Sequence, residues 1–400
     1  MLPASPQYAA AQAILRKLRG EGHQAYLAGG CVRDLLLGRE PNDYDVATSA
    51  TPEIVLDLFP RTFAVGAHFG VVLVSAEIDG QPTLTEVATF RSDGAYSDGR
   101  HPDAVRYTLS AEEDVQRRDF TINGLLLDPD KIDPDKVDPG KGTGFSPYVS
   151  PAEPPGALAP EGLKSAVLDY VGGLADLDTG IIRAIGQPER RFEEDHLRML
   201  RAVRFAARFS FEIAPATQSA MRSLAPKIEA VSRERVRDEL TRMLTEGHAR
   251  RAFELLDQTG LLAQVLPEVC RLKGVEQPPQ YHPEGDVWTH TLMLLAQLEP
   301  GSPMTLAWGA LLHDIGKPAT FQPAQGPGDR IRFNGHVEVG VAIAAEICRR
   351  LRFSNEETTQ ILALIQNHMR FADTPRMKTS TLKRFFRLDR FPEQDRKSVV

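Results

Sequence analysis

Two acidic residues separated by one position follow closely behind a glycine pair near the N-terminus. The segment 27–46 reads LAGGCVRDLLLGREPNDYDV, so an apolar run ends in Gly29 and Gly30, and Asp43 and Asp45 come about a dozen residues later. Side chains alternate along a strand, so the two carboxylates project to the same side. They repel each other unless a cation lies between them, and hard oxygen ligands suit Mg²⁺. The spacing therefore predicts a magnesium site.

The glycine pair predicts a phosphate-binding turn. Gly30 lets the backbone approach a triphosphate closely, and the helix that begins there offers free N–H groups to phosphate oxygens. Arg33 adds a guanidinium in the first turn of that helix. A Gly-Gly or an Asp-x-Asp by itself is usually an ordinary turn or a solvated loop. Because both occur in this order with Arg33 between them, we interpret them together as a site of nucleotidyl transfer.

Composition is that of an ordinary globular protein. The chain has 400 residues, 42% hydrophobic and 25% charged, a length that predicts roughly two to four domains. Its three cysteines form no Cys-x-x-Cys pair, which argues against disulfides and a thiolate zinc site and favours a reducing cytoplasm. Neither a signal peptide nor an apolar run of membrane-spanning length is evident. We predict a cytoplasmic protein without a membrane partner.

Basic residues are concentrated in two blocks, although the net charge is −7. Residues 181–251 hold 15 Lys and Arg against 10 Asp and Glu, and residues 369–400 hold 9 against 4, a balance of +5 in each. A phosphate-backbone ligand would require such segregation. Basic helices are also common as solvated surfaces, so the charge alone leaves both interpretations open.

Hydrophobic patterning predicts an α/β first domain followed by helices. Near the N-terminus we expect one helix and three strands, at 7–20, Gln24–Ala28, Val71–Ile78 and Thr83–Phe90. Residues 128–165 are rich in Pro, Gly, Asp and Lys and are expected to form a flexible insertion. Beyond Asp176 helical periodicity dominates, and a Pro- and Gln-rich break at 274–283 precedes a last globular unit.

One continuous helix with a polar ridge is expected over residues 191–208. Four charged residues recur on it every three positions: Asp195, Arg198, Arg201 and Arg204. Such a ridge is usually a salt-bridged surface. Alternatively, a carboxylate accepts from the amino group that cytosine and adenine share, and a guanidinium donates to their unprotonated ring nitrogen. Asp195 with Arg198 would then accept C and A and reject G and U without a template.

Four ordered motifs give most of the chain its resemblance to the class II tRNA nucleotidyltransferase and bacterial poly(A) polymerase family. They are the glycine and aspartate segment, RRDFTIN from Arg117 to Asn123, YVGGLADL from Tyr170 to Leu177, and Glu194-Asp195-x-x-Arg198-x-x-Arg201. A basic element, Ser232-Arg-Glu-Arg235, lies where the family's last motif falls. The segment Phe90–Pro102 resembles the family's mobile loop, which is implicated in switching from C to A addition.

The resemblance implies an α/β nucleotidyltransferase palm head followed by mainly α-helical neck, body, HD and tail regions. We expect the head in residues 1–170, the neck and body in 171–273, an HD-like domain in 282–371 and a basic helical tail in 372–400. Relatives commonly continue further, so we expect a shortened tail. Gly124 stands where the family usually has Ala.

The same resemblance implies template-independent addition of C and A from CTP and ATP to the 3′ end of tRNA. Asp43 and Asp45 are expected to be catalytic and to bind Mg²⁺, with Glu86 as a candidate third carboxylate. Seven residues are expected to bind nucleotide: Gly30, Arg33, Arg118, Asp195, Arg198, Arg201 and Arg204. The RNA 3′-hydroxyl would attack the α-phosphate and pyrophosphate would leave. Full CCA addition, CC-only addition, A-only addition and poly(A) synthesis share these motifs, so the product stays open.

A histidine pattern near the C-terminus resembles an HD phosphohydrolase domain. Adjacent His313 and Asp314 supply nitrogen and oxygen ligands from one turn, with His290 before them and His336 and His368 after them. A second divalent metal held by these residues would activate water. Val337 stands where relatives often have Glu, and no clear terminal Asp ligand follows.

Two hypotheses of other classes therefore stay open. The chain could be chiefly an HD-type phosphohydrolase acting on nucleotide or RNA phosphoesters, with a head that only binds RNA. It could also transfer nucleotides to a small molecule or a protein, but such an enzyme needs neither the predicted neck helix nor the second basic block. The sequence leaves the oligomeric state open.

Overall fold

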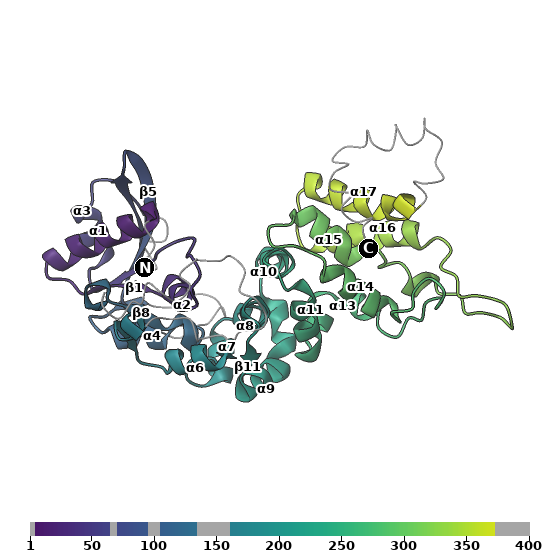
Figure 1. Cartoon of the computed structure of the whole chain (residues 1–400), viewed down its shortest axis with the longest axis horizontal. Helices are drawn as coiled ribbons and strands as arrows, with labels where there is room; N and C mark the ends of the chain where they lie inside the picture. The colour runs from purple at the N-terminus through teal and green to yellow at the C-terminus, as the bar shows by residue number, and fades with distance from the viewer. Residues whose placement is uncertain (1–4, 65–69, 95–104, 134–160, 373–400) are drawn as a thin grey trace. The chain divides into compact units, whose positions relative to one another are not determined.

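The computed structural model describes residues 5–64, 70–94, 105–133 and 161–372 (Figure 1). The chain divides into two compact units. Unit 1 comprises Met1–Asp195 and Phe211–Thr217, and unit 2 comprises His196–Ser210 and Gln218–Val400. No helix in the described part of the chain is long and apolar enough to cross a membrane.

Unit 1 is built on a seven-stranded mixed sheet in the order β3-β4-β5-β2-β1-β8-β9. Neighbours β1 and β2 are antiparallel, whereas β2 and β5 are parallel. The hairpin between β4 and β5 turns at Asp79-Gly80, where both residues have positive φ, as a two-residue hairpin loop of the favoured twist requires. The strands are β1 (Ala25–Ala28), β2 (Val46–Thr48), β3 (Thr62–Phe63), β4 (Val71–Ile78), β5 (Gln81–Thr89), β8 (Leu125–Leu127) and β9 (Val167–Asp169).

Helix α1 (Pro6–Gly20) packs on this sheet, against β4 and β5. It begins with Ser5 as N-cap and Pro6 in the first turn, and Ile14 and Leu18 are in its buried stripe. The other elements of unit 1 are α2 (Gly30–Leu36), α3 (Pro52–Leu58), β6 (Arg91–Asp93), β7 (Val105–Tyr107), α4 (Ala111–Gln116), η2 (Thr121–Asn123), η3 (Pro129–Lys131), α5 (Glu161–Lys164), α6 (Gly173–Thr179), β10 (Ile181–Ile182), α7 (Pro188–Glu194) and β11 (Glu212–Ile213).

Unit 2 is helical and holds the predicted HD domain together with most of the predicted neck and body, whereas residues 171–195 and 211–217 belong to unit 1. Helix α8 (Leu197–Phe209) packs against α10 (Arg233–Thr245) and α11 (Ala249–Gln258), and α10 packs in turn against α15 (Met304–Leu312). Trp308 of α15 is fully buried, and its Nε1 donates to Oγ1 of Thr241 on α10 over 2.9 Å. The remaining elements are α12 (Leu261–Val265), α13 (Pro267–Cys270), α14 (Val287–Leu295), η6 (Pro318–Thr320), α16 (His336–Arg350) and α17 (Asn355–Ala372), while α9 (Pro215–Leu224) and η5 (Ala225–Ala230) lead into it.

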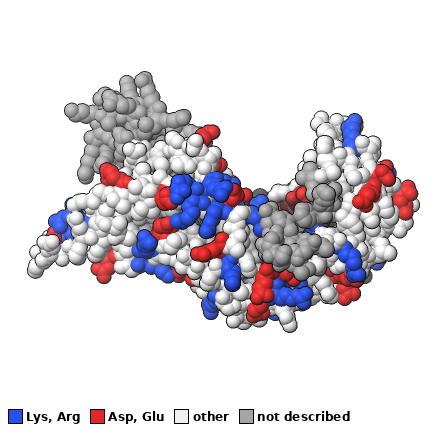
Figure 2. All heavy atoms as spheres, turned by 180° about the vertical axis from the view of Figure 1, so that it is seen from behind, with Lys and Arg blue, Asp and Glu red and all other residues white. Residues whose placement is uncertain are grey.

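Much of the positive charge in residues 181–251 is paired locally. In unit 2, Arg242 pairs with Glu239, and Arg208 with Glu246. On the face seen in Figure 2, basic and acidic side chains accordingly lie next to each other. The balance of +5 therefore does not by itself define a uniformly basic surface.

The predicted α/β head and helical remainder are confirmed, as are the helix near the N-terminus and the three strands. The prediction of one continuous helix over 191–208 is wrong. Asp195 ends α7 in an extended conformation (φ −150°, ψ 105°), and α8 starts at Leu197, so the break coincides with the boundary between the units. Most of the predicted insertion, the loop residues 95–102 and nearly all of the predicted tail lie outside the described residues.

Candidate active sites in the two units

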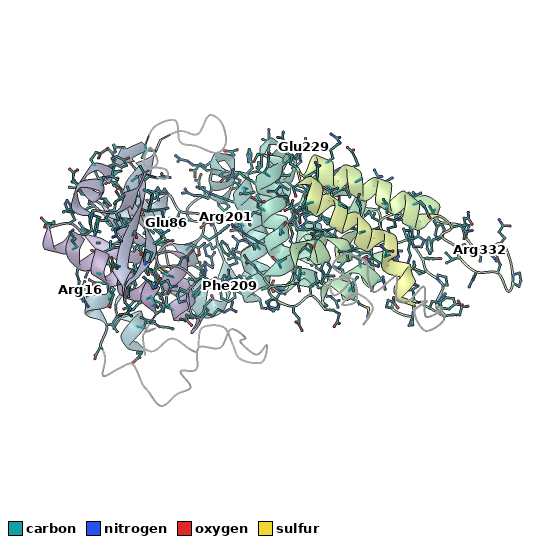
Figure 3. All side chains as sticks on the ribbon, turned by 90° about the horizontal axis from the view of Figure 1, so that it is seen from above. Arg16, Glu86, Arg201, Phe209, Glu229 and Arg332 are labelled. Carbon is teal, nitrogen blue, oxygen red and sulfur yellow. The ribbon has the colours of Figure 1, made fainter. Side chains whose placement is uncertain are left out.

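Asp45 and Glu86 lie side by side at one end of paired strands. Strands β2 and β5 run parallel with Val46 opposite Val87, so the residues that precede these two are also neighbours on the same face. The backbone of Asp45 is fixed from the other side, where its carbonyl accepts from the N–H of Ala28 at 3.0 Å. Figure 3 marks Glu86 on the sheet of unit 1. The sheet thus brings together two carboxylates that are 41 positions apart in sequence.

The charges of this cluster perturb one another. Burial raises the pKa of Asp45 to about 7, with further increases from Glu86 and Asp43, while Arg118 acts in the opposite direction. Repulsion of this kind favours a proton or a bound cation. Oxygen donors from Asp43, Asp45 and Glu86 are the ligand type that a hard divalent cation prefers.

The turn before α2 leaves room for the side chain of Arg118. Gly29 has φ 71° and ψ −122°, a conformation that side chains disfavour. A Cβ atom at this position would lie 2.9 Å from a terminal nitrogen of Arg118. The N–H of Gly29 donates to the carbonyl of Leu125 on β8. The glycine therefore allows the Arg118 guanidinium to approach the start of the helix that carries Gly30 and Arg33.

A network from the RRDFTIN segment holds these arginines. Arg33 is 4% exposed and donates to Oδ1 of Asp34 at 2.8 Å and to Oδ1 of Asn123 at 2.5 Å. Arg118 donates to Asp114 at 3.0 Å. Burial favours the neutral form of Asp114, but Arg118 and Arg117 lower its pKa overall. The structure thus brings Gly30, Arg33 and Arg118 together with the carboxylate cluster, within one unit.

The YVGGLADL motif supports this network from behind. A Cβ atom on Gly173 would lie 2.2 Å from the carbonyl oxygen of Thr121, so only glycine lets α6 pack on η2. The hydroxyl of Thr121 donates to Asp176 at 2.7 Å. Gly124 is equally confined, because a Cβ atom there would lie 2.8 Å from Val171. The glycine in place of the usual alanine thus fits the packing.

The predicted polar ridge is divided between the units. Asp195 belongs to unit 1, whereas Arg198, Arg201 (marked in Figure 3) and Arg204 lie on α8 in unit 2. Arg204 is 5% exposed, and its guanidinium contacts Glu239 at 2.7 Å. A second carboxylate, of Glu246, lies 3.5 Å away. Arg204 is thus used in the packing of α8 on α10, and its assignment to nucleotide binding stays a prediction.

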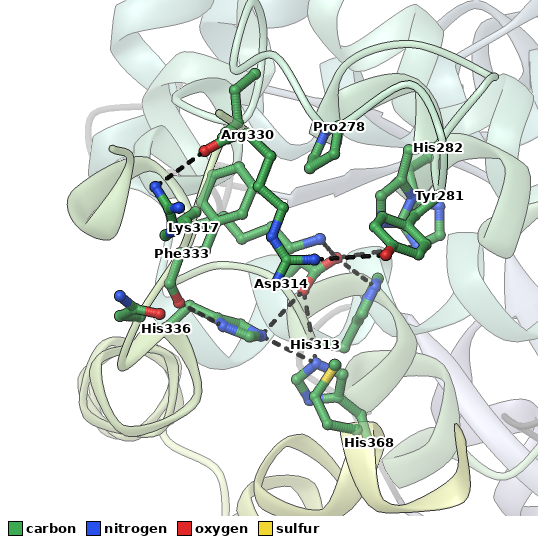
Figure 4. A pocket seen from close by; sticks show the side chains of 15 residues that line it. Pro278, Tyr281, His282, His313, Asp314, Lys317, Arg330, Phe333, His336 and His368 are labelled. Atoms are coloured by element: carbon green, nitrogen blue, oxygen red, sulfur yellow. Dashed lines mark hydrogen bonds and ion pairs between the residues drawn. The ribbon is translucent and has the colours of Figure 1, made fainter. Parts of the chain in front are cut away.

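The second site is a cavity of about 620 Å³ in unit 2, and all five predicted HD ligands line it (Figure 4). Three of its histidines donate from Nδ1 to backbone carbonyls: His313 to Ala310 at 2.8 Å, His336 to Phe333 at 2.9 Å, and His368 to Ile365 at 2.6 Å. A carbonyl oxygen only accepts, so each Nδ1 carries the hydrogen and each neutral ring keeps its lone pair on Nε2.

The Nε2 atoms of these three histidines and of His290 surround Asp314, which is 3% exposed. They lie 3.0 Å (His313), 3.8 Å (His336), 3.6 Å (His368) and 3.9 Å (His290) from its carboxylate oxygens. The Nε2 atoms of His336 and His368 are 3.4 Å apart. Two nitrogen lone pairs that face each other at this distance repel unless a cation or a proton lies between them.

One carboxylate oxygen of Asp314 supports metal binding at this site. Its Oδ1 is buried and has no hydrogen-bond partner among the described residues, whereas Oδ2 pairs with Lys317 at 2.8 Å. Burial favours the neutral acid, but His313, His368 and Lys317 hold the pKa of Asp314 well below its ordinary value. An ionised carboxylate oxygen without a donor, surrounded by imidazole nitrogens, fits a divalent cation.

A glycine contact brings His336 to this site. A Cβ atom on Gly316 would lie 2.1 Å from the carbonyl oxygen of His336 and 2.6 Å from the nitrogen of Gly340. Helix α16 therefore packs directly against the turn that carries Asp314. Four further residues that lie at or near the cavity were not identified from the sequence. They are Gln277, His282 and Glu284, which precede His290 in the sequence, and Lys317, which follows Asp314.

Three family models match consecutive segments of the chain. Residues 25–143 match the poly(A) polymerase head domain, residues 210–272 match the "Probable RNA and SrmB-binding site of polymerase A", and residues 286–393 match the HD domain. Together with the sheet of unit 1, these matches indicate a head domain of the nucleotidyltransferase type and a separate HD domain in one chain. Over these segments the chain is similar to the class II tRNA nucleotidyltransferase and bacterial poly(A) polymerase family.

Its similarity to curated relatives covers part of their length. The CCA-adding enzyme of Geobacillus stearothermophilus is 38% identical over 258 residues, which are 64% of this chain and 54% of that protein. The CCA-adding enzyme of Lactobacillus johnsonii is 33% identical over 292 residues, 72% of this chain and 64% of that protein. The chain thus spans between half and two thirds of the length of these relatives.

Solved structures agree with the fold. The Bacillus stearothermophilus CCA-adding enzyme in complex with CTP is 27% identical, with a TM-score of 0.67 over 98% of this chain and 82% of that chain. The Thermotoga maritima CCA-adding enzyme complexed with tRNA has a TM-score of 0.57 over 100% of this chain and 80% of that chain, and at 16% identity it supports the fold alone.

Proposed function

We propose that the protein adds C and A from CTP and ATP to the 3′ end of tRNA without a template. One observation carries the proposal: the carboxylate cluster of Asp43, Asp45 and Glu86 shares unit 1 with the glycine turn and the buried arginine network. The relatives to which the chain is similar are named CCA-adding enzymes, and the structure of one of them was solved in complex with CTP.

In this proposal each group of unit 1 has a defined task. Asp43 and Asp45, with Glu86 beside them, hold Mg²⁺, which when bound lowers the pKa of the attacking hydroxyl and stabilises the leaving oxygens. Gly30 gives the triphosphate close access to the backbone, and Arg118 supplies positive charge beside it. The RNA 3′-hydroxyl attacks the α-phosphorus in line, and pyrophosphate leaves.

We assign selection of the base to Asp195 and Arg198. Asp195 accepts from the exocyclic amino group of C or A, and Arg198 donates to the neighbouring ring nitrogen. Arg201 adds positive charge to the same helix. On G or U the carboxylate would face a carbonyl oxygen, and the guanidinium would face a ring N–H. Neither pair can form a hydrogen bond, so the unpaired buried groups would disfavour these bases.

Product length tests this proposal. A tRNA transcript without its CCA end is incubated with Mg²⁺ and labelled CTP alone, ATP alone or both, and the products are separated on a gel. We expect two added residues with CTP alone and three with both nucleotides. A ladder of added A residues would instead indicate poly(A) synthesis. Absence of incorporation by well-folded protein would refute the proposal.

For unit 2 we propose a divalent metal held by His290, His313, Asp314, His336 and His368, and hydrolysis of small phosphoesters. The donor-free oxygen of Asp314 favours this second function. The metal, when bound, activates a water molecule. A cavity of about 620 Å³ has the size of a site for one nucleotide rather than for folded RNA. Elemental analysis of the purified protein, with hydrolysis of bis(p-nitrophenyl) phosphate, tests both parts.

We also propose a cytoplasmic location. The three cysteines are present as thiols, two of them buried, which suits a reducing compartment. The four-part division into head, neck and body, HD domain and tail is retained as a proposal. Its head ends at residue 170, whereas unit 1 continues to Asp195. Limited proteolysis followed by mass spectrometry locates the boundaries.

A further inference from the structure

A single carboxylate oxygen joins two histidines at the edge of the HD cavity. Oε1 of Glu284 lies 2.9 Å from Nδ1 of His282 and 2.7 Å from Nδ1 of His290. The two rings meet edge to face, with centroids 4.9 Å apart.

His290 is thereby oriented differently from the other histidines around Asp314. Backbone carbonyls accept from Nδ1 of His313, His336 and His368, whereas a charged carboxylate accepts from Nδ1 of His290. A carboxylate behind a metal-binding imidazole fixes the tautomer and raises the basicity of the other nitrogen. Nε2 of His290, which faces Asp314, is therefore a stronger metal ligand than the Nε2 atoms of the other three histidines.

The same carboxylate orients His282. With the hydrogen of its Nδ1 directed to Glu284, the neutral ring keeps an unprotonated Nε2. His282 lines the cavity next to Tyr281, outside the group of five predicted ligands (Figure 4). An imidazole nitrogen in this state accepts a hydrogen bond from a hydroxyl group or a water molecule.

The segment that carries Glu284 is held at several points. Asp286 accepts from the N–H of Gly274 at 2.7 Å and from the N–H of Thr289 at 2.8 Å, which fixes the start of α14. Gln277, 4% exposed, accepts from Lys317 at 2.7 Å, and Lys317 pairs with Asp314. Residues 274–286 therefore reach the metal site twice, through Gln277 and through Glu284.

We propose that Glu284 is a positioning residue with two tasks: it fixes His290 toward the metal of unit 2 and His282 toward the phosphoester ligand in the cavity. His282 then contacts the ligand or its attacking water without binding the metal. This inference rests on the hydrolase function proposed for unit 2.

Four variants of the full chain separate the two tasks: Glu284→Ala, Glu284→Gln, His282→Ala and, as a matched control, Glu268→Gln. Glu268 contacts Arg350 at 2.5 Å in the same unit, away from the cavity. Affinity for Mn²⁺ is measured by calorimetry, and long-range ¹H–¹⁵N spectra of ¹⁵N-histidine protein report the tautomers. Thermal unfolding and nucleotide incorporation check that each variant is folded.

We expect Glu284→Ala to weaken Mn²⁺ binding by about 10- to 100-fold. Glu284→Gln should recover part of this loss, because its amide oxygen still accepts from Nδ1. His282→Ala should bind Mn²⁺ as the wild type does, but should hydrolyse bis(p-nitrophenyl) phosphate about tenfold more slowly, the equivalent of one hydrogen bond. Glu268→Gln should change neither property.

Two results would overturn the inference while the hydrolase function stands: Mn²⁺ affinity of Glu284→Ala equal to that of Glu268→Gln, or Nε2–H tautomers for His282 and His290 in the metal-free wild type. A wild-type chain that binds no Mn²⁺ and hydrolyses no phosphoester would refute the hydrolase function, and the inference with it.

Discussion

The candidate sites of units 1 and 2 prepare for a divalent cation in opposite ways. In unit 1 the donors are carboxylates that repel one another, and the pKa of Asp45 rises to about 7. In unit 2 burial favours the neutral acid of Asp314, but His313 and Lys317 hold its pKa low, so the carboxylate is ionised, and four oriented imidazoles surround it.

This difference indicates how each site acquires its metal. A strained cluster of oxygen donors gains most when the cation arrives together with a triphosphate, which neutralises the remaining charge. A preorganised set of nitrogen donors around one carboxylate retains a cation between turnovers. We therefore expect the first site to exchange Mg²⁺ freely and the second to copurify with its metal.

The largest expected effect separates the two activities. Asp43→Asn removes one charged ligand from unit 1 and should lower nucleotide incorporation about a thousandfold, equivalent to several kcal/mol of transition-state stabilisation. Hydrolysis of bis(p-nitrophenyl) phosphate should be unchanged. Asp314→Asn should do the reverse. Both activities are measured on the same preparations, and a variant that loses both activities while still folded would contradict the separation.

The next effect concerns Arg204. Arg204→Met leaves Glu239 buried without its 2.7 Å partner and should destabilise unit 2 by about 3–5 kcal/mol, measured by urea unfolding. Arg201→Met, one turn earlier on the same helix, should have little effect on stability but should weaken nucleotide incorporation. The reverse pattern, with a stable Arg204→Met that adds wrong bases, would support a role of Arg204 in nucleotide binding.

The sequence could predict those parts of the sites that depend on local spacing. Asp43 and Asp45 are two positions apart, and His313 is adjacent to Asp314, so one strand or one turn places each pair. Arg204 could not be judged in this way, because its partner Glu239 lies on another helix. Glu284 was missed for a similar reason, since its task depends on a loop that folds back onto α14.

The break after α7 illustrates a different limit. Periodicity predicted one helix through Asp195 because Asp195 is in phase with the arginines that recur every three positions after it. The structure instead places the boundary between its two units there. Helical periodicity does not detect a break when the residues on each side remain in phase.

A smaller effect is expected at Gly316. Gly316→Ala adds a methyl group 2.1 Å from the carbonyl of His336, so α16 must move and His336 must leave Asp314. We expect a loss of about 1–3 kcal/mol in the stability of unit 2, with weaker Mn²⁺ binding. Gly326→Ala is the matched control, because nothing lies within 4 Å of its added carbon. Equal metal affinity in the two variants would argue against a role for His336.

The last effect is a pH dependence in unit 1. The folded protein keeps a proton on Asp45 up to about pH 7, whereas the unfolded chain loses it near the ordinary pKa of 3.8. Stability of the metal-free protein therefore falls as pH rises through this window. Asp45→Asn lacks this loss, so its melting temperature relative to the wild type should be higher at pH 8 than at pH 4. Mg²⁺ at pH 8 should raise the melting temperature of the wild type but not that of Asp45→Asn. A pH-independent difference would contradict the raised pKa.

The most direct test of the account is the 3′-end sequence of the product. Transcripts of tRNA without the CCA end are incubated with CTP, ATP and Mg²⁺, together with wild-type protein or Asp45→Asn, and their ends are sequenced. The account predicts CCA ends with the wild type and unextended ends with the variant. Unextended ends with folded wild type, or CCA ends with Asp45→Asn, would contradict it.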